Sequence, residues 1–250
     1  MKILVANDDG IYASGIKALA NAMSEIADEV IIVAPDVEQS ATSSSLTLRR
    51  PLRYRETKLN NLADNVKAYR VDGTPADCVI LGVHNEKRPD LVVAGINLGP
   101  NLGYDIIYSG TVAAATEATT MGIPAIAFSI GLGDTDIDFS YAQDYAKKIA
   151  LHVLEHGLAE RTLLNVNFPN TKPVGIKLCR QSTHQWSDNV IKRKDPEGKD
   201  YYWISGVPVG TEEKDADYYV VKNGYVGVTP LHLDMTEYKT LVDLEKLMNE

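Results

Sequence analysis

Residues 2–10 read KILVANDDG, a short apolar run that is broken at once by an asparagine, two aspartates and a glycine. From Ile16 to Ala27 apolar residues recur at helical spacing, which predicts an amphipathic helix. A second apolar run extends from Glu29 to Ala34 and stops at Pro35. Strands that are apolar at every position are buried on both faces, so this strand, helix, strand unit indicates a parallel sheet with helices on both sides.

The same alternation continues along the chain. Further strands are predicted at Val66–Val71, Asp90–Ala94, Ala125–Ile130 and Thr162–Phe168, and further helices from Thr74 to about Val83, at Thr111–Met121 and at Tyr141–Leu158. The stretch from Thr74 to Asp77 combines an N-cap, a proline at the first helical position and an acidic first turn. The pattern predicts an α/β protein with a doubly wound, mostly parallel sheet, Rossmann-like and built in three layers.

The chain of 250 residues, 44% hydrophobic and 24% charged, has the composition of one globular domain. We expect a core over about 1–180, an extended antiparallel arm over 181–230 and a tail over 231–250 with a helix at Leu241–Met248. Polar and aromatic residues mix from Gln181 to Tyr225, with a turn signal at 195–198. An arm and tail of this kind often pack on a neighbouring subunit.

Charge and cysteine content exclude several classes of protein. The net charge of -9 and pI of about 5.1 repel polyanions, so duplex nucleic acid is not an expected partner. Cys78 and Cys179 each lie in an apolar stretch, as free thiols do in a reducing compartment. The apolar run at Ile3–Ala6 is too short for a signal sequence, and no run approaches the roughly 20 residues that span a bilayer. We therefore expect a cytoplasmic protein without a membrane anchor.

Asp8 and Asp9 directly follow the first strand, at the sheet edge where open parallel sheets bind their ligands. Two carboxylates about 4 Å apart repel by roughly 4 kcal/mol at an effective dielectric of 20, so they call for a cation or a shared proton. Neighbours that offer only oxygen ligands favour Mg²⁺ or Mn²⁺ over zinc. The alternative is a solvated turn in which one aspartate caps the next helix.

Three more segments bring polar groups to the same edge. Residues 36–47 follow the second strand and are rich in hydroxyls, of which Ser40 is the first, although a flexible linker would look similar. Residues 95–103 contain three glycines together with Asn97 and Asn101. Tyr108-Ser109-Gly110-Thr111 opens a helix, where backbone N–H groups favour an anion, or where Ser109 or Thr111 simply caps the helix.

Together these segments closely resemble the SurE survival-protein family of 5'-nucleotidases. The resemblance rests on residues 7–10, 34–40, 73–78, 95–103 and 108–112, and it extends through 202–204 and 224–226 to 229–231, covering nearly the full length. It implies a cytoplasmic phosphatase that hydrolyses nucleoside 5'-monophosphates, with 3'-nucleotides and short polyphosphate as further candidate substrates. It also implies one divalent metal ion per subunit, Mg or Mn, and a homodimer or homotetramer formed through the arm and tail.

The resemblance assigns roles to individual residues. The metal ligands that it implies are Asp8, Asp9, Ser40 and Asn97. As a hypothesis from the residues themselves, Asp8 and Asp9 are catalytic, and the substrate-binding candidates are Asn7, Asn101, Ser109, Gly110 and Thr111. We hypothesise that a metal-activated water attacks phosphorus, an aspartyl-phosphate route being the alternative. One departure is Ala41, where the family commonly has glycine after the metal-binding serine.

Other readings of the sequence compete with this one. His152-Val153-Leu154-Glu155-His156 fits the H-x-x-E-H pattern of some zinc peptidases, although we expect core or helix-end histidines there. The acidic stretch 133–138 is expected to be a solvated turn rather than a second metal loop. A nucleotide-binding module without catalytic activity remains the main rival, because a doubly wound sheet alone does not imply turnover.

Overall fold

The structure, a computed structural model, describes residues 1–132, 137–187, 189–210 and 213–244. Its centre is a nine-stranded sheet in the order β3-β4-β2-β1-β5-β6-β7-β13-β8. The bounds of these strands are, in chain order, β1 Lys2–Ala6, β2 Glu29–Pro35, β3 Tyr54–Glu56, β4 Val66–Val71, β5 Leu91–Leu98, β6 Ala125–Ile130, β7 Thr162–Phe168, β8 Ile176–Leu178 and β13 Val226–His232. All pairings from β4 to β7 are parallel, so the predicted mostly parallel sheet is confirmed.

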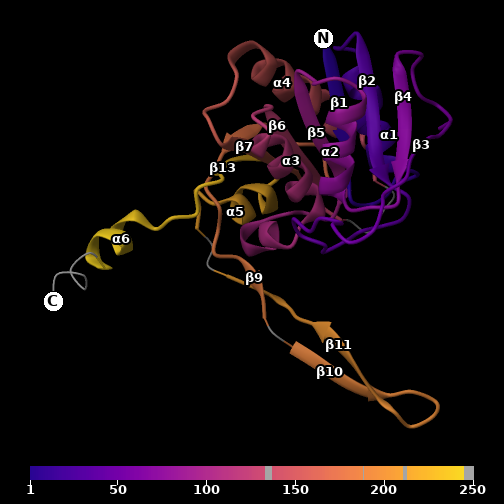
Figure 1. Cartoon of the computed structure of the whole chain (residues 1–250). Coiled ribbons are helices and arrows are strands. Elements are labelled where there is room, and N and C mark those ends of the chain that lie inside the picture. The colour runs from indigo at the N-terminus through magenta and orange to yellow at the C-terminus, as the bar shows by residue number, and fades with distance from the viewer. Residues whose placement is uncertain (133–136, 188, 211–212, 245–250) are drawn as a thin grey trace.

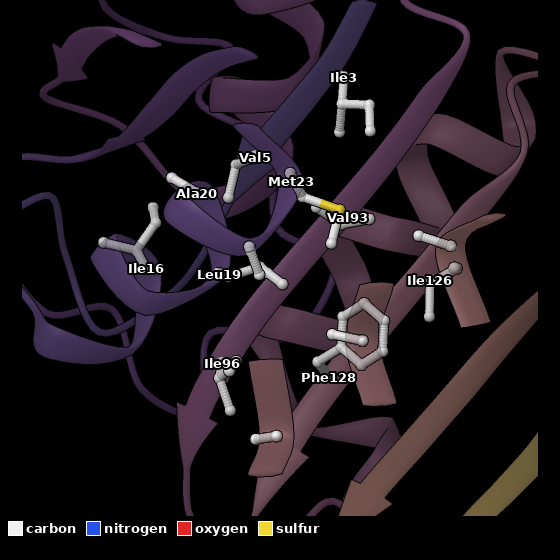
Figure 2. Close-up of a cluster of buried hydrophobic side chains, with 14 of the residues drawn as sticks. Ile3, Val5, Ile16, Leu19, Ala20, Met23, Val93, Ile96, Ile126 and Phe128 are labelled. Carbon is white, nitrogen blue, oxygen red and sulfur yellow. The ribbon is translucent and has the colours of Figure 1, made fainter. Parts of the chain in front are cut away.

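Helices cover both faces of this sheet, as Figure 1 shows. Helices α1 (Ser14–Ser24) and α4 (Ser140–His156) pack on one face, and α2 (Pro75–Asn85) and α3 (Gly110–Thr120) on the other. In Figure 2 the apolar side of α1 meets Ile3, Val93 and Phe128 of the sheet. The two apolar layers confirm the doubly wound, three-layer fold.

Local sequence chemistry explains where α2 begins. The Thr74 side chain accepts a hydrogen bond from the Asp77 N–H at 3.2 Å, and the Asp77 carboxylate accepts one from the Thr74 N–H at 2.9 Å. Pro75 occupies the first turn, where its missing N–H costs nothing. The predicted N-cap is confirmed, and the helix runs two residues beyond Val83 to Asn85.

The order of the strands creates a crevice beside β1. The chain passes from β1 to β2 on one side, and later enters β5 on the other side of β1. Loops that leave the carboxyl ends of β1 and β5 therefore turn in opposite directions, which is the point where open α/β sheets bind ligands.

The C-terminal third differs from the expected arm and tail. Strands β10 (Asn189–Lys194) and β11 (Asp200–Ser205) form a hairpin that projects from the body, with every residue exposed (Figure 1). Short strands β9 (Gln185–Trp186) and β12 (Pro208–Val209) pair at its base. The arm is thus shorter than 181–230, because α5 (Asp217–Lys222) packs on β13 and β13 pairs antiparallel with β7 inside the main sheet. Val226 and Val228 of β13 are buried in the core. The pairing of β13 with β7 could not be inferred from the local sequence.

Beyond β13 the chain leaves the body again. Helix α6 spans Tyr238–Leu244 and has no buried residue, so the predicted terminal helix begins three residues earlier than expected, and its predicted end lies outside the described residues. Within the described part of the chain, none of the helices combines the length and apolar character needed to cross a membrane.

Candidate active site

Asp8 lies in the turn after β1 and is held against the N-terminus of α3. Its side chain is almost buried, with 4% of the residue exposed, and its Oδ1 accepts a hydrogen bond from the Thr111 hydroxyl. Burial raises the pKa of the Asp8 carboxyl, and hydrogen bonds from Thr111 and from the Gly110 backbone act in the opposite direction. The dipole and free N–H groups of the helix therefore partly compensate the cost of burying a carboxylate.

Gly110 is the position that lets Asp8 come this close. A Cβ atom on Gly110 would lie 2.8 Å from the Asp8 Cβ and 2.9 Å from its Oδ2. Both distances are shorter than any normal contact between such atoms. Glycine at the start of α3 is therefore required by the carboxylate and not by the helix.

Asp9 is half-buried beside Asp8 and is less tightly bound by protein groups. Its Oδ2 accepts a hydrogen bond from the Leu98 N–H at 3.3 Å. Burial and then the charge of Asp8 raise the pKa of Asp9 to about 6. Two neighbouring carboxylates thus lie at the end of β1 in a setting that disfavours their charge.

The loop after β2 folds onto the same turn. The Gln39 N–H donates to the Asp8 carbonyl at 2.7 Å, and the Ile11 N–H donates to the Pro35 carbonyl at 2.9 Å. These bonds carry the exposed Ser40 to the cavity that Asp8 lines, where its hydroxyl donates to Glu38 at 2.6 Å. Ala41, next in the chain, has a φ of +56°, a left-handed conformation that glycine adopts at little cost.

Asn97 reaches the site because β5 is irregular at its carboxyl end. The register with β6 shifts between Ala94 and Asn97, and Gly95 takes a φ of +128° with its α-carbon close to the Phe128 carbonyl. A Cβ at Gly95 would lie 2.2 Å from that carbonyl oxygen. The Asn97 amide N–H donates to the Gly99 carbonyl at 2.8 Å. Because the amide nitrogen is used in this bond, the amide oxygen is the atom of Asn97 that can bind a ligand.

A cavity of about 450 Å³ lies at the switch point of the sheet, and Asp9 is not among the residues of its lining. Of the predicted site residues it is lined by Asp8, Ser40, Asn97, Asn101 and Ser109. Its lining contains no lysine or arginine among the residues that the structure describes. The predicted convergence of loops at one sheet edge is thus present, in an acidic cavity.

Asn101 and Ser109 are fixed by bonds that leave them in the cavity wall. The Asn101 N–H donates to the Asn167 side chain at 2.8 Å, and its amide donates to the Ser129 hydroxyl at 2.7 Å. Ser109 caps α3 by accepting from the Val112 N–H at 3.1 Å. The capping role and a place in the site are therefore compatible.

Three predicted substrate-binding residues lie behind the cavity instead of in its wall. Asn7 is fully buried, and its amide donates to the Gly10 carbonyl at 3.0 Å, so it shapes the turn that carries Asp8. Thr111 is fully buried with its hydroxyl on Asp8, and Gly110 packs against the same carboxylate. The helix N-terminus that the sequence suggested for phosphate holds a carboxylate of the protein.

Other residues of the cavity are not predicted from the sequence. Asp105 comes from the short 3-10 helix η1 (Gly103–Ile107), while His184, Trp186 and Tyr218 come from the C-terminal third. The only sequence signal for these three is the mixed polar and aromatic texture after Gln181, which predicts an arm and not a cavity wall. Tyr108, which opens the motif at the start of α3, also lines the cavity.

The donor set fits a hard divalent cation. Asp8, Asp9, Ser40 and Asn97 can each present an oxygen atom to a cation, and no lysine or arginine of the described lining supplies a counter-charge to the carboxylates. The described residues contain no group of three or more His, Cys, Asp or Glu that could hold a metal ion, so a cation here needs neutral ligands such as Ser40 and Asn97.

The competing metal motifs lie elsewhere. His152 and His156 are exposed and stack on each other at 4.3 Å near the end of α4, so of the two expected placements, core or helix end, they take the helix end. They are absent from the cavity lining. Of the acidic stretch 133–138, residues 133–136 lie outside the described part of the chain, and Asp138 accepts from the Ser140 N–H at 2.9 Å.

Fold and cavity together define a doubly wound α/β protein with an acidic ligand site at the switch point of its sheet. The chain belongs to the SurE family, because the family model described as survival protein SurE matches residues 3–188. It is 54% identical to 5'-nucleotidase SurE 1 of Thermus thermophilus, over 99% of this chain and 98% of that protein. It is 50% identical to 5'-nucleotidase SurE of Deinococcus radiodurans, over 99% and 92%. The crystal structure of the SurE protein from Aquifex aeolicus superimposes with a TM-score of 0.84, at 44% identity over 99% of this chain and 100% of that one.

Proposed function

We propose that this chain is a divalent-metal-dependent phosphatase that hydrolyses nucleoside 5'-monophosphates to nucleoside and inorganic phosphate. The observation that carries the proposal is the buried Asp8 carboxylate, held at the N-terminus of α3 in a cavity that Ser40 and Asn97 also line and whose described lining contains no lysine or arginine. The names of the relatives from Thermus thermophilus and Deinococcus radiodurans support the same activity.

The residues that would hold the proposed metal ion, Mg²⁺ or Mn²⁺, are Asp8, Asp9, Ser40 and Asn97. When bound, the ion would supply Lewis-acid chemistry, which polarises a phosphoryl oxygen and lowers the pKa of the attacking water. Asp8 is locked to α3 and keeps a fixed position, whereas Asp9 is the freer carboxylate and accepts the proton of the attacking water. Ser109 and Asn101, both in the cavity wall, donate to the phosphoryl oxygens.

Direct attack by water is favoured over a phosphoenzyme at Asp8. A carboxylate with one oxygen bonded to Thr111 and only 4% of the residue exposed is a poor nucleophile. Acid quenching during turnover of ³²P-labelled AMP tests this step. A phosphoprotein that survives the acid quench, is cleaved by hydroxylamine and disappears in Asp8→Asn would establish the covalent route instead.

The experiment that tests the function is release of inorganic phosphate from AMP and GMP with added Mn²⁺ or Mg²⁺. We expect chelation by EDTA to abolish release, and Asp8→Asn and Asp9→Asn to lower kcat/KM by about a hundredfold or more. Asp64→Asn, an exposed carboxyl outside the cavity, is the matched control and keeps full activity. Nucleotide binding without phosphate release would support the non-catalytic module. Including 3'-AMP and tripolyphosphate in the panel decides whether these are substrates too.

We also propose that the arm and tail pack on further copies of the chain. A two-stranded hairpin is marginally stable alone, yet β10 and β11 are exposed at every residue and carry Trp203 at 63% and Ile204 at 92% exposure. Light scattering should give a mass of two or four times 27.4 kDa.

Free, buried Cys78 and Cys179 support a reducing compartment, and we place the enzyme in the cytoplasm.

A further inference from the structure

One wall of the active-site cavity comes from a segment far from the carboxylates in the sequence. His184, Trp186 and Tyr218 line the cavity together with Asp8 and Ser40. None of the proposed chemical steps uses these aromatic side chains. Their presence in a cavity of about 450 Å³, a size typical of small-molecule sites, calls for a ligand group other than phosphate.

This wall is anchored to the loop that follows β5. The Tyr104 N–H donates to the His184 carbonyl at 2.9 Å, and the Gln181 side chain donates to the Gly103 carbonyl at 2.7 Å. The Asp217 carboxylate, almost fully buried, accepts from the Gly103 N–H at 3.0 Å and from the Ser182 N–H at 3.1 Å. The aromatic wall is therefore fixed relative to the loop that also carries Asn101 and that follows the end of β5 with Asn97.

Trp186 is the aromatic side chain of this wall that offers a face to a ligand. His184 is 6% exposed, and its ring stacks on that of Tyr218 with 4.1 Å between ring centroids and an interplanar angle of 13°. Each of these rings therefore covers one face of the other. Trp186 is 54% exposed, and its indole N–H donates to the Asp105 carboxylate at 3.2 Å. Asp105 thus orients the indole while the indole face stays accessible.

Charge decides which part of a ligand lies against this wall. Asp105 is a carboxylate in the lining and would repel a phosphate group placed beside Trp186. The phosphate therefore belongs at the end of the cavity with Asp8, where the proposed cation offsets the negative charge. An uncharged, flat group suits the Trp186 end, since every nucleobase has a π-face that stacks on an aromatic ring.

We propose that Trp186, oriented by Asp105, is the platform on which the nucleobase of the substrate stacks. The proposal rests on the proposed phosphatase function and adds to it that the enzyme prefers a nucleotide to the same phosphate ester without a base. Trp186 is a binding residue in this scheme, and Asp105 is a positioning residue that acts through it. Base stacking on one aromatic side chain corresponds to a preference of roughly ten- to a hundredfold.

The kinetic test compares AMP with ribose 5-phosphate, which keeps the sugar and the phosphate but lacks the base. We expect Trp186→Ala to lower the ratio of kcat/KM for AMP to that for ribose 5-phosphate about tenfold or more, mainly through KM, and Trp186→Phe to restore much of it. Trp203→Ala, which removes the other tryptophan of the chain from the exposed arm, is the matched control and leaves the ratio unchanged. An unchanged ratio in Trp186→Ala would overturn the proposal.

The role of Asp105 is tested by a pair of variants. Asp105→Asn keeps an oxygen that accepts from the indole N–H and should preserve most of the preference for AMP, whereas Asp105→Ala removes the acceptor and should lose it. Trp186 fluorescence anisotropy, measured in a Trp203→Phe background, should fall in Asp105→Ala. If Asp105→Asn and Asp105→Ala behave alike in both measurements, Asp105 does not position the indole.

A binding measurement separates this proposal from the phosphatase function. In Trp203→Phe, Trp186 is the single tryptophan, and stacking of adenosine should quench its fluorescence without any turnover. If the wild-type protein released phosphate from neither ester, the phosphatase function would be refuted. Quenching by adenosine would still show whether a base stacks on Trp186. Phosphate release from both esters without quenching by adenosine would leave the function intact and refute the platform.

Discussion

Gly110→Ala tests whether the close approach of α3 to Asp8 is a requirement of the active site. The substitution adds one methyl group at the start of the helix, 2.8 Å from the Asp8 Cβ, 2.9 Å from its Oδ2 and 3.1 Å from the Pro75 Cγ. Ordinary carbon contacts are about 3.5–4.0 Å, so the Asp8 side chain has to move by roughly 0.5–1 Å. Because Pro75 flanks the same site, α3 cannot simply shift towards α2.

Two effects of opposite sign act on stability. Alanine favours the helix over glycine by less than about 1 kcal/mol, whereas overpacking a tight contact costs about 1–3 kcal/mol. We therefore expect a net loss of about 1 kcal/mol in the free energy of unfolding. Activity should respond far more strongly, because misplacing a catalytic group by about 1 Å costs roughly a hundredfold.

The assay measures kcat/KM for AMP at saturating Mn²⁺, with urea unfolding of the same preparations. Gly175→Ala is the matched control, because a Cβ there meets nothing within 4 Å, and it should keep wild-type activity. A Gly110→Ala enzyme with activity within twofold of the wild type would refute the reasoning. It would mean that Asp8 either moves without consequence or takes no part in the reaction.

Two more predictions concern strain and charge outside the carboxylate pair. Ala41 has a φ of +56°, so Ala41→Gly should remove left-handed strain and raise the free energy of unfolding by about 0.5–1 kcal/mol, measured by urea denaturation; a loss of stability would contradict this. Hydrogen bonds from Lys2 and then Lys67 lower the pKa of Glu29 to about 2 from its ordinary value of 4.5. The stabilisation is complete above about pH 4.5 and is lost as the pH falls towards 2, so Glu29→Gln should cost about 1 kcal/mol at pH 7 after screening and flatten the stability curve over that range. Circular dichroism measures the stability of both proteins as the pH is lowered. If the wild type and Glu29→Gln lose stability equally steeply, Glu29 does not have this role.

The sequence predicts the secondary structure and the location of the site better than it predicts the contacts within the site. The helix start at Thr74 depends on atoms three residues apart, so it can be inferred from four letters of sequence. Asp8 and Ser40 could be placed at one sheet edge because parallel strands bring their carboxyl ends together. The partner of Thr111 could not be inferred, since the same hydroxyl at a helix start serves equally well as a cap, a phosphate ligand or a donor to Asp8.

Local periodicity and the order of buried strands determined the doubly wound sheet and the edge at which its ligand site lies, because both depend on which residues can leave water. Contacts across more than a hundred residues decided the rest. They place Thr111 beneath Asp8 and bind Gly103 to Asp217. Such pairings depend on how the packed helices and strands meet in space. The spacing of residues along the chain does not show which distant residues will come into contact.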